Sequence, residues 1–573
     1  MIHTRGWEGL PQFSQDMYKE RYFLKDEDYQ AWTRRMSMFA DDFAMQERIE
    51  GYINNYWFHP STPVSSNGNA PQRGLPISCY VNEVEDSKTG IFAKFTENNW
   101  LGAEGGGIGT SWSNVREIGA KVGENGESSG IIPFIKVSDS STLAVSQGGL
   151  RRASQAVYLD VSHPEIEEFI DVRRPTGDTN RRSLNVHHGV VISDLFMEAV
   201  DKRTTWDLLS PKDNRVVKTV DAFDLYKKML VTRMETGEPY MLFKDTVNEF
   251  APEEYKENNL EVTMSNLCIE ITLHTAPDYT GVCCLGSINL EYYDEFSVDM
   301  EQFIYDCNRF LDNVLQSFID LTENKPGFEN ARKSAINERS IGLGVMGFAG
   351  LLQKRGLPWD SPMTKGLNTK IFKDFKYYND QANYHSAIKF GKCPLSRNRR
   401  NTHSSSIAPT ASISTLCNGS SQGVDPRLGN SYVHKTNIGT YTQRNTYLEA
   451  HLEEIGKNTP EVWKSITKNE GSVQHLDFLS SYTKDVFKTA YEINQHVVVD
   501  LACDRAPFID QAQSINIFLR ADEHVENVYN IHFRAWKGKL KSMYYCRSTS
   551  ATRASAGSQD RQVISYDECL SCQ

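Results

Sequence analysis

One short segment of the sequence brings together three side chains that could act on a bound substrate. In SNLCIEITL, Asn266, Cys268 and Glu270 alternate, and alternating residues of an extended segment project to one side. An amide, a thiol and a carboxylate would then converge on one small volume, where the carboxylate could act as a general base. The alternative is a buried cysteine with two incidental polar neighbours. Because burying Asn266 and Glu270 without partners costs free energy, three facing polar groups favour a site.

Cysteine usage argues against a disulfide scaffold. The chain has 11 cysteines, an odd number at irregular spacing in a large chain, and from its mixed, charged start we expect no secretory signal. In a reducing compartment such thiols are either buried as small apolar side chains or reactive. Cys569 and Cys572 form a CxxC pair, but the second Cys or His pair that tetrahedral zinc needs is missing. We therefore expect no metal site in this chain.

Two further sequence patterns suggest a dinucleotide loop and a metal site, but neither has the residues that such a site requires. GGGIG, at residues 105–109, is not a dinucleotide loop, because Thr110 stands where the third glycine of GxGxxG is required. We interpret these residues as turn glycines, and the chain also has no GxxxxGK[ST] phosphate loop. His187 and His188 have no nearby Cys or carboxylate at ligand spacing, so we expect ordinary packing or surface histidines.

Composition predicts a soluble globular protein rather than a nucleic-acid or membrane protein. The 573 residues carry a net charge of −12, with a sequence pI near 5.7, which argues against a chain-wide grip on nucleic acid. Hydrophobic residues make up 39% and the mean hydropathy is −0.51, which fits a sizeable core. No apolar run approaches the roughly 18 residues of a membrane span. We expect a cytoplasmic protein without membrane or nucleic-acid partners.

The elements that must position these residues are an intermixed set of helices and strands. Residues 1–60 show mostly helical spacing, residues 61–547 form the expected α/β body, and residues 548–573 are small and polar, as in a flexible tail. The clearest helix is predicted over residues 299–324, with Asp299 as its N-cap, and another over residues 221–236, stopped by Gly237. GVVIS and SINIFL are typical of strands.

Six ordered motifs give the chain a resemblance to a known family. LPISCY, SQGGLRRAS, NLCIE, VCCLGSINL, IAPTASIS and MYYCR resemble the large catalytic subunit of ribonucleotide reductase, in its class I form, from about residue 20 to the C-terminus. The resemblance implies a ten-stranded α/β barrel of two half-sheets with a central finger loop that carries a radical-forming cysteine. A helical N-terminal segment and a flexible C-terminal tail complete the expected architecture.

The resemblance also implies a role for each member of the thiol set. A thiyl radical on Cys268 would abstract the 3′-hydrogen of the ribose, Glu270 would accept the 3′-hydroxyl proton, and Asn266 would hold the substrate. Cys79 and Cys283 would supply the reducing electrons and end as a disulfide. Since the family usually has a single cysteine after the valine of VCCLGSINL, the match assigns the redox role to Cys283 and leaves Cys284 structural. Four other cysteines match no catalytic position: Cys307, Cys393, Cys417 and Cys503.

Nucleotide contacts are implied at two sites. A phosphate-binding turn that opens a helix is expected at Pro409, Thr410, Ala411, Ser412, Ile413 and Ser414. Thr62 and Ser78 match positions that touch ribose or phosphate. The specificity site, where a nucleoside triphosphate effector selects the base to be reduced, is expected at Asp86, Arg116, Gln147 and Arg151.

The radical source and the reductant are expected outside the barrel. Tyr544 and Tyr545 match a stacked tyrosine pair that relays a radical from a separate small subunit holding the radical metallocofactor, although adjacent tyrosines are otherwise often plain core aromatics. A class II enzyme would use adenosylcobalamin instead, and class III is disfavoured because no RxxGY motif lies near the C-terminus. Cys569 and Cys572 resemble a shuttle pair that exchanges with the active-site disulfide and is reduced by thioredoxin or glutaredoxin.

Three expectations concern the whole enzyme. Ribonucleoside diphosphates are the expected substrates, with triphosphates left open, and the expected assembly is a homodimer. Nothing before Cys79 resembles an N-terminal ATP cone, so we expect that dATP does not inhibit through such a domain. A non-catalytic nucleotide-binding paralogue is the competing hypothesis, but it would be expected to have lost part of the thiol set, which is present.

Overall fold

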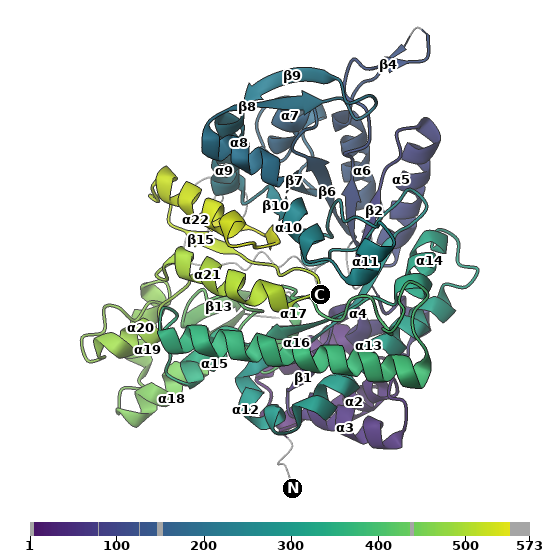
Figure 1. The fold of residues 1–573 in the computed structure, drawn as a ribbon. Coiled ribbons are helices and arrows are strands. Elements are labelled where there is room, and N and C mark those ends of the chain that lie inside the picture. Colours follow the sequence, from purple (N-terminus) through teal and green to yellow (C-terminus); the bar gives the residue numbers. More distant parts are fainter. Residues whose placement is uncertain (1–4, 78, 125, 146–152, 436–439, 550–573) are drawn as a thin grey trace.

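Five parallel strands form the first half of a barrel. The computed structural model describes residues 5–77, 79–124, 126–145, 153–435 and 440–549. In it the strands pair in chain order: β2 (Cys79–Glu83), β3 (Gly107–Ser111), β6 (Ser154–Asp160), β7 (His187–Ile192) and β10 (Tyr240–Phe243). Each connection carries at least one helix, as parallel pairing requires. These helices surround the upper part of Figure 1: α5 (Lys88–Ala103), α6 (Ile132–Val145), α7 (Ile166–Ile170), α8 (Asp194–Lys202) and α9 (Ala222–Thr236).

The second half repeats this pattern with less regular strands. β11 (Gly281–Asn289) pairs in parallel with β12 (Ile341–Met346). Residues 403–407 follow, where Leu343 N donates to Ser404 O over 3.0 Å. Residues 511–519 come next, joined by Ile407 N donating to Ala512 O over 3.1 Å. The end of this segment is β15 (Ile517–Leu519), which pairs in parallel with β17 (Cys546–Ser548).

Antiparallel pairs join the two halves at both edges. β2 pairs with β11, and β10 pairs with β16 (Ser542–Met543), the strand just before β17. Five strand segments in each half, with both seams closed, make ten, which confirms the expected barrel of two half-sheets. β1 (Phe58–Pro60) pairs with the far end of β11.

Amphipathic helices cover the second half. α13 (Met300–Leu321) and α16 (Pro362–Phe390) pack together and run along the lower part of Figure 1. α13 confirms the predicted helix, since the Asp299 side chain accepts from Gln302 N. α9 likewise ends at Gly237, whose φ is 89°. The other helices here are α14 (Glu329–Glu338), α15 (Phe348–Lys354), α21 (Gln495–Arg505) and α22 (Val525–Lys537).

Two helical groups flank the barrel. Before β1 the chain forms α1 (Gln12–Met17), a π-helical turn (Tyr18–Tyr22), α2 (Tyr29–Ser37) and α3 (Phe43–Asn54). This group contacts α13 through the Arg48–Asp306 and Asp41–Arg309 ion pairs. The second group, with a small core of its own, is α18 (Thr446–Glu454), α19 (Pro460–Lys468) and α20 (Ser481–Val486). No helix among the described residues is long and apolar enough to cross a membrane.

Candidate active site

The finger loop, residues 261–275, crosses the barrel between the two half-sheets. From the first half, the Tyr158 hydroxyl in β6 donates to Asn266 O over 2.5 Å. From the second half, Ala512 N donates to Glu270 O over 2.9 Å, and Ser514 Oγ donates to Cys268 O over 2.6 Å. Because both walls hold its backbone, the loop tip has a fixed place in the barrel interior.

Gly109 in β3 lets the loop come this close. A Cβ at Gly109 would lie 1.9 Å from Ser265 O and 2.8 Å from Asn266 Cα, well inside any allowed contact. The interpretation of GGGIG as turn glycines is therefore wrong for its second half, since Gly107–Ser111 is strand β3. Gly105, with a φ of 78°, does lie in a turn.

The tip of the finger loop is a turn and not an extended strand. Ile269 has a φ of 63° and its N–H donates to Asn266 O over 3.3 Å. The Asn266 side chain accepts from Ile271 N over 3.1 Å, which is typical of asparagine stabilising a local turn. The extended conformation expected for Asn266, Cys268 and Glu270 is thus wrong, and all three residues are buried, at 1%, 3% and 1% exposure.

Cys79 and Cys283 face each other across the β2–β11 seam. They are register partners in this antiparallel pair, an arrangement that puts Cα atoms about 4.5–5.5 Å apart, within the range that a disulfide can bridge. Cys283 shares an interior cluster with Cys268, and Cys79 packs against the same cluster. Cys284, the next residue, belongs to the outer core behind the barrel wall.

Burial and one side-chain amide define the surroundings of Cys283. Burial raises the pKa of its thiol well above the ordinary value. Gln511 Nε2 lies 3.3 Å from the Cys283 sulfur, while Gln511 Oε1 accepts from Thr272 N over 3.1 Å. Gln511 therefore connects the redox seam to the finger loop. The sequence analysis missed this residue, because no local pattern marks it.

A small pocket adjoins the two cysteines. Its lining includes Cys79, Cys283, Ser61 and Pro63, so the predicted contact residue Thr62 lies between two lining residues. Thr62 opens α4 (Thr62–Asn67), and its hydroxyl lies 3.4 Å from that of Tyr22 in the N-terminal helical group.

The predicted phosphate turn does open a helix. α17 (Ala411–Leu416) follows Thr410, which has a φ of 55° and accepts from Gly423 N through its hydroxyl over 2.7 Å. Ala408, just before the turn, belongs to the interior cluster that also holds Cys268. The six predicted residues, 409–414, therefore lead from the barrel interior into the first turn of α17.

The tyrosine pair also reaches the interior cluster. Tyr544 and Tyr545 have ring centroids 4.2 Å apart with planes tilted by 51°, which differs from the stacked arrangement expected. A third ring, Tyr240 of β10, lies 4.8 Å from Tyr544 and 5.1 Å from Tyr545. Their exposures are only 2% for Tyr544 and 8% for Tyr545.

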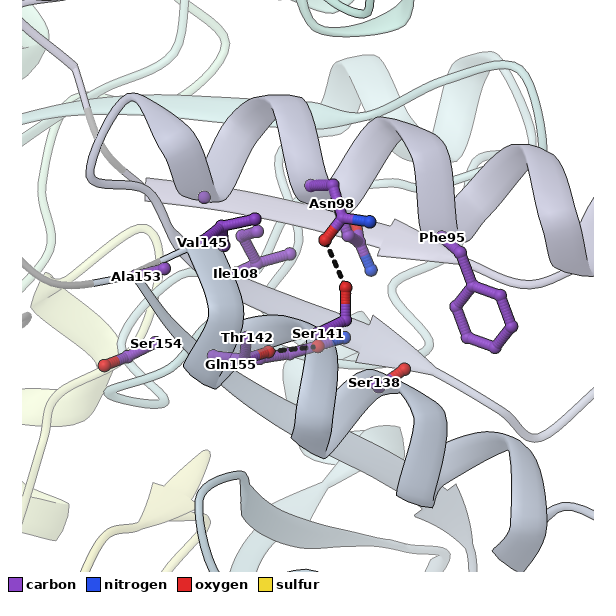
Figure 2. Close-up of a pocket in the computed structure, with 12 residues that line it drawn as sticks. Phe95, Asn98, Ile108, Ser138, Ser141, Thr142, Val145, Ala153, Ser154 and Gln155 are labelled. Carbon is purple, nitrogen blue, oxygen red and sulfur yellow. Dashed lines mark hydrogen bonds between the residues drawn. The ribbon is translucent and has the colours of Figure 1, made fainter. Parts of the chain in front are cut away.

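Two of the four predicted effector residues are described and form an ion pair. Arg116 Nε lies 2.8 Å from Asp86 Oδ2. Gln147 and Arg151, like Ser78, Cys569 and Cys572, lie outside the described residues. A separate small pocket lies between α5, α6, β3 and β6, where Thr142 and Gln155 are hydrogen-bonded (Figure 2), and none of the predicted site residues that the structure describes lines it.

Comparisons with known proteins agree on one family. The family model described as the ribonucleotide reductase barrel domain matches residues 77–399 and 395–546. A Frog virus 3 (isolate Goorha) protein assigned as a ribonucleoside-diphosphate reductase large subunit is 40% identical, with 92% of each chain covered. The ribonucleoside-diphosphate reductase large subunit of Invertebrate iridescent virus 3 is 36% identical, covering 89% of this chain and 88% of the relative.

A solved structure extends this agreement to three dimensions. The Actinobacillus ureae class Id ribonucleotide reductase alpha subunit superposes with a TM-score of 0.84 at 30% identity, covering 96% of this chain and 99% of that one. The barrel, its finger loop and the family match all lead to one assignment: this chain belongs to the ribonucleotide reductase large, catalytic subunits.

Proposed function

We propose that the chain reduces ribonucleoside diphosphates to 2′-deoxyribonucleoside diphosphates by thiyl-radical chemistry inside the barrel. The observation that carries this proposal is the register pairing of Cys79 with Cys283 beside the finger loop of Cys268. The named relatives that are ribonucleoside-diphosphate reductases support the diphosphate as substrate.

The proposed steps give each of these residues a defined role. The Cys268 thiyl radical takes the 3′-hydrogen, and Glu270 accepts the 3′-hydroxyl proton while Asn266 holds the substrate. The 2′-hydroxyl leaves as water with a proton from one thiol of the Cys79–Cys283 pair, and the hydrogen of the other thiol goes to C2′. The two sulfurs then give up two electrons and join as a disulfide, and the 3′-hydrogen returns from Cys268. One ribonucleotide and one dithiol thus yield one deoxyribonucleotide, one disulfide and one water.

We propose one nucleotide site for the substrate and a second one for the effector. The substrate diphosphate is assigned to the turn at residues 409–414, with Thr62 and Ser78 near the ribose and phosphate. A nucleoside triphosphate effector is assigned to Asp86, Arg116, Gln147 and Arg151. The pocket beside Ser61, Cys79 and Cys283 supports the first assignment, and the Asp86–Arg116 ion pair supports the second.

Three partners complete the proposed cycle. A radical metallocofactor in a separate small subunit would oxidise Tyr545, from which the radical passes through Tyr544 to Cys268; the likeness to a class Id alpha subunit supports this. Thioredoxin or glutaredoxin would restore the dithiol through Cys569 and Cys572, and two copies of the chain would form a homodimer. The proposed organisation is a helical segment at residues 1–60, a catalytic barrel at 61–547 and a redox-active tail at 548–573.

The test is deoxynucleotide formation by the purified chain with dithiothreitol, a ribonucleoside diphosphate and a triphosphate effector. We expect no product with adenosylcobalamin alone, and product once a metal-loaded small subunit is added. Product with adenosylcobalamin alone would instead make the chain a class II reductase and Tyr544 and Tyr545 plain aromatics. No product in either arm would support a non-catalytic paralogue.

A further inference from the structure

One buried side-chain amide donates to a sulfur of the redox pair. Gln511 is completely buried, at 0% exposure, and its Nε2 lies 3.3 Å from the sulfur of Cys283. The same Nε2 lies 3.4 Å from Ile341 O, so each of its two N–H groups has an acceptor of its own. One of these N–H groups is therefore directed at the sulfur.

The partners of Gln511 allow only this orientation of its amide. Gln511 Oε1 accepts from Thr272 N over 3.1 Å. If the amide were turned over, its N–H groups would meet the N–H of Thr272, and its oxygen would meet the carbonyl oxygen of Ile341. Both contacts would be repulsive, because donors would face donors and acceptors would face acceptors. The side chain of Gln511 therefore faces Cys283 as a donor and not as an acceptor.

The segment that carries Gln511 is itself held in place. Gln511 N donates to Ser405 O over 3.1 Å. The ammonium group of Lys541, which is 2% exposed, donates to the carbonyl oxygens of residues 509, 510 and 511 over 2.7, 3.0 and 2.8 Å. A donor that is already in place when a charge develops stabilises that charge without reorganisation.

The hydrogen bond from Gln511 opposes the effect of burial on Cys283. Burial raises the pKa of the Cys283 thiol, and Cys79 and Glu270 raise it further, whereas the hydrogen bond from Gln511 lowers it. Hydrogen bonds to charged groups are about twice as strong as those between neutral groups, so this donor matters most when Cys283 is a thiolate. A stabilised thiolate is also the better leaving group in thiol–disulfide exchange.

The two cysteines of the pair also differ in access. Cys79 is partly exposed, whereas Cys283 is only 1% exposed. Both line the small pocket beside Ser61 and Pro63. The outcome of thiol–disulfide exchange depends on which sulfur the attacking thiolate can reach. Access therefore favours attack at Cys79 and departure of Cys283.

We propose that Gln511 makes Cys283 the leaving sulfur when the Cys79–Cys283 disulfide is reduced, so that a dithiol reductant attacks Cys79. The inference rests on the proposed function, in which this disulfide forms in each turnover. A thiolate of the reductant bonds to the Cys79 sulfur, the Cys79–Cys283 bond breaks, and its electron pair stays on Cys283. The second thiolate of the reductant then displaces Cys79 from the mixed disulfide. The two protons that the reductant has released go to Cys283 and Cys79, so one dithiol becomes a disulfide and one disulfide becomes two thiols.

The first test compares Gln511→Met with Gln513→Met in the full chain. Methionine is similar in length to glutamine, has no N–H group to donate, and its sulfur is a weak acceptor. Gln513 is the matched control, because it lies on the same segment and is 1% exposed, while its amide bonds Arg505 Nε and Ala502 O rather than a cysteine.

Reduction of a preformed disulfide measures the role of the donor directly. The Cys79–Cys283 disulfide is formed with diamide, and its reduction by dithiothreitol is followed by alkylation and mass spectrometry. We expect Gln511→Met to slow this reduction about tenfold, and Gln513→Met to stay within about threefold of wild type. Equal rates for the two variants would overturn the proposal.

A single turnover separates this role from placement of the finger loop. The pre-reduced chain, assayed once with the metal-loaded small subunit and no reductant, needs no exchange. Because the finger loop keeps its bonds to Ala512 N and Ser514 Oγ, Gln511→Met should form product within about threefold of the wild-type rate. A single-turnover loss as large as the loss in disulfide reduction would show that Gln511 only positions the loop, and would overturn the proposal.

The attacked sulfur is mapped on the wild-type chain, so this measurement needs no variant. The oxidised chain is treated briefly with 2-mercaptoethanol, quenched with acid and alkylated. We expect the 2-mercaptoethanol adduct on Cys79 with Cys283 as the free thiol, and an adduct on Cys283 would overturn the proposal. A wild-type chain that forms the disulfide but no deoxynucleotide would overturn the proposed function alone. A chain in which Cys79 and Cys283 form no disulfide would overturn both.

Discussion

Adjacent cysteines in β11 face opposite sides of the barrel wall. Cys283 points into the interior cluster with Cys268, and Cys284 packs in the outer core. Strand alternation alone requires opposite faces, but it does not say which cysteine faces inward. The register of β2 against β11 decides this, because Cys79 stands opposite Cys283.

Serine substitutions distinguish the two thiols. We expect Cys283→Ser to abolish repeated turnover, because no disulfide with Cys79 can form, and Cys284→Ser to keep most of the wild-type rate. Alkylation and mass spectrometry after one turnover without reductant should show a Cys79–Cys283 disulfide in wild type and in Cys284→Ser. A disulfide from Cys79 to Cys284 would contradict this assignment.

Among the helices and strands, those whose ends are set by nearby residues could be predicted from the sequence. The helix over 299–324 and the stop at Gly237 follow from caps that lie within four residues of the helix ends. The strand β3 was not predicted because Gly109 is required by its close contact with the finger loop, which is far away in the sequence. The turn at Ile269 and the Gln511–Cys283 contact depend in the same way on distant segments.

The close approach of β3 to the finger loop predicts a functional requirement for Gly109. Gly109→Ala places a methyl group against the Ser265 carbonyl, so the loop and Cys268 must shift. A misplacement of about 1 Å can cost about 100-fold in rate, and we expect a loss of at least this size in kcat. Gly366→Ala, on α16 with open space around its Cβ position, is the control and should retain full activity. Full activity in Gly109→Ala would show that the loop tolerates displacement.

Glu165 holds both ends of the loop that contains β4 (Lys121–Val122) and β5 (Gly126–Glu127). Its Oε2 accepts from Ile118 N over 3.2 Å and from Ile131 N over 3.0 Å. Desolvation by burial raises the pKa of this carboxyl to about 7, although the two N–H donors oppose the shift. The closed loop therefore holds a proton that an opened, solvated loop releases.

Because of this raised pKa, the stability of the closed loop is expected to fall as the pH rises. Its stability against opening is fully present below about pH 4.5 and is lost as the pH rises through about 7. Hydrogen exchange at Ile118 and Ile131, corrected for intrinsic rates, should show falling protection between pH 5.5 and pH 8, values chosen about the shifted pKa. Glu165→Gln should remove this dependence. Equal protection at both pH values in wild type would contradict the prediction.

At the scale of the whole molecule, one buried carboxylate ties together segments from across the chain. Asp312 on α13 is 1% exposed and pairs with Arg309 over 2.6 Å, with Arg339 over 2.7 Å and with Arg400 over 3.0 Å. Arg309 also pairs with Asp41 in the N-terminal helical group. The pKa of Asp312 falls to about 2, because its arginine neighbours outweigh the opposing effect of burial. This network joins the N-terminal helical group, α13, Arg339 just before β12 and Arg400 just before residues 403–407.

Removing the central charge should therefore weaken the molecule as a whole. Asp312→Asn leaves three arginines facing one another without their shared anion, and breaking a buried ion pair in this way costs about 3–5 kcal/mol. We expect the midpoint of urea unfolding to fall clearly. Asp294→Asn is the matched control, because Asp294 pairs with Arg355 at the surface, where its side chain is 53% exposed and the loss should stay within about 1 kcal/mol. Equal midpoints for the two variants would mean that packing of α13 and its neighbours, rather than this network, holds the helical groups on the barrel.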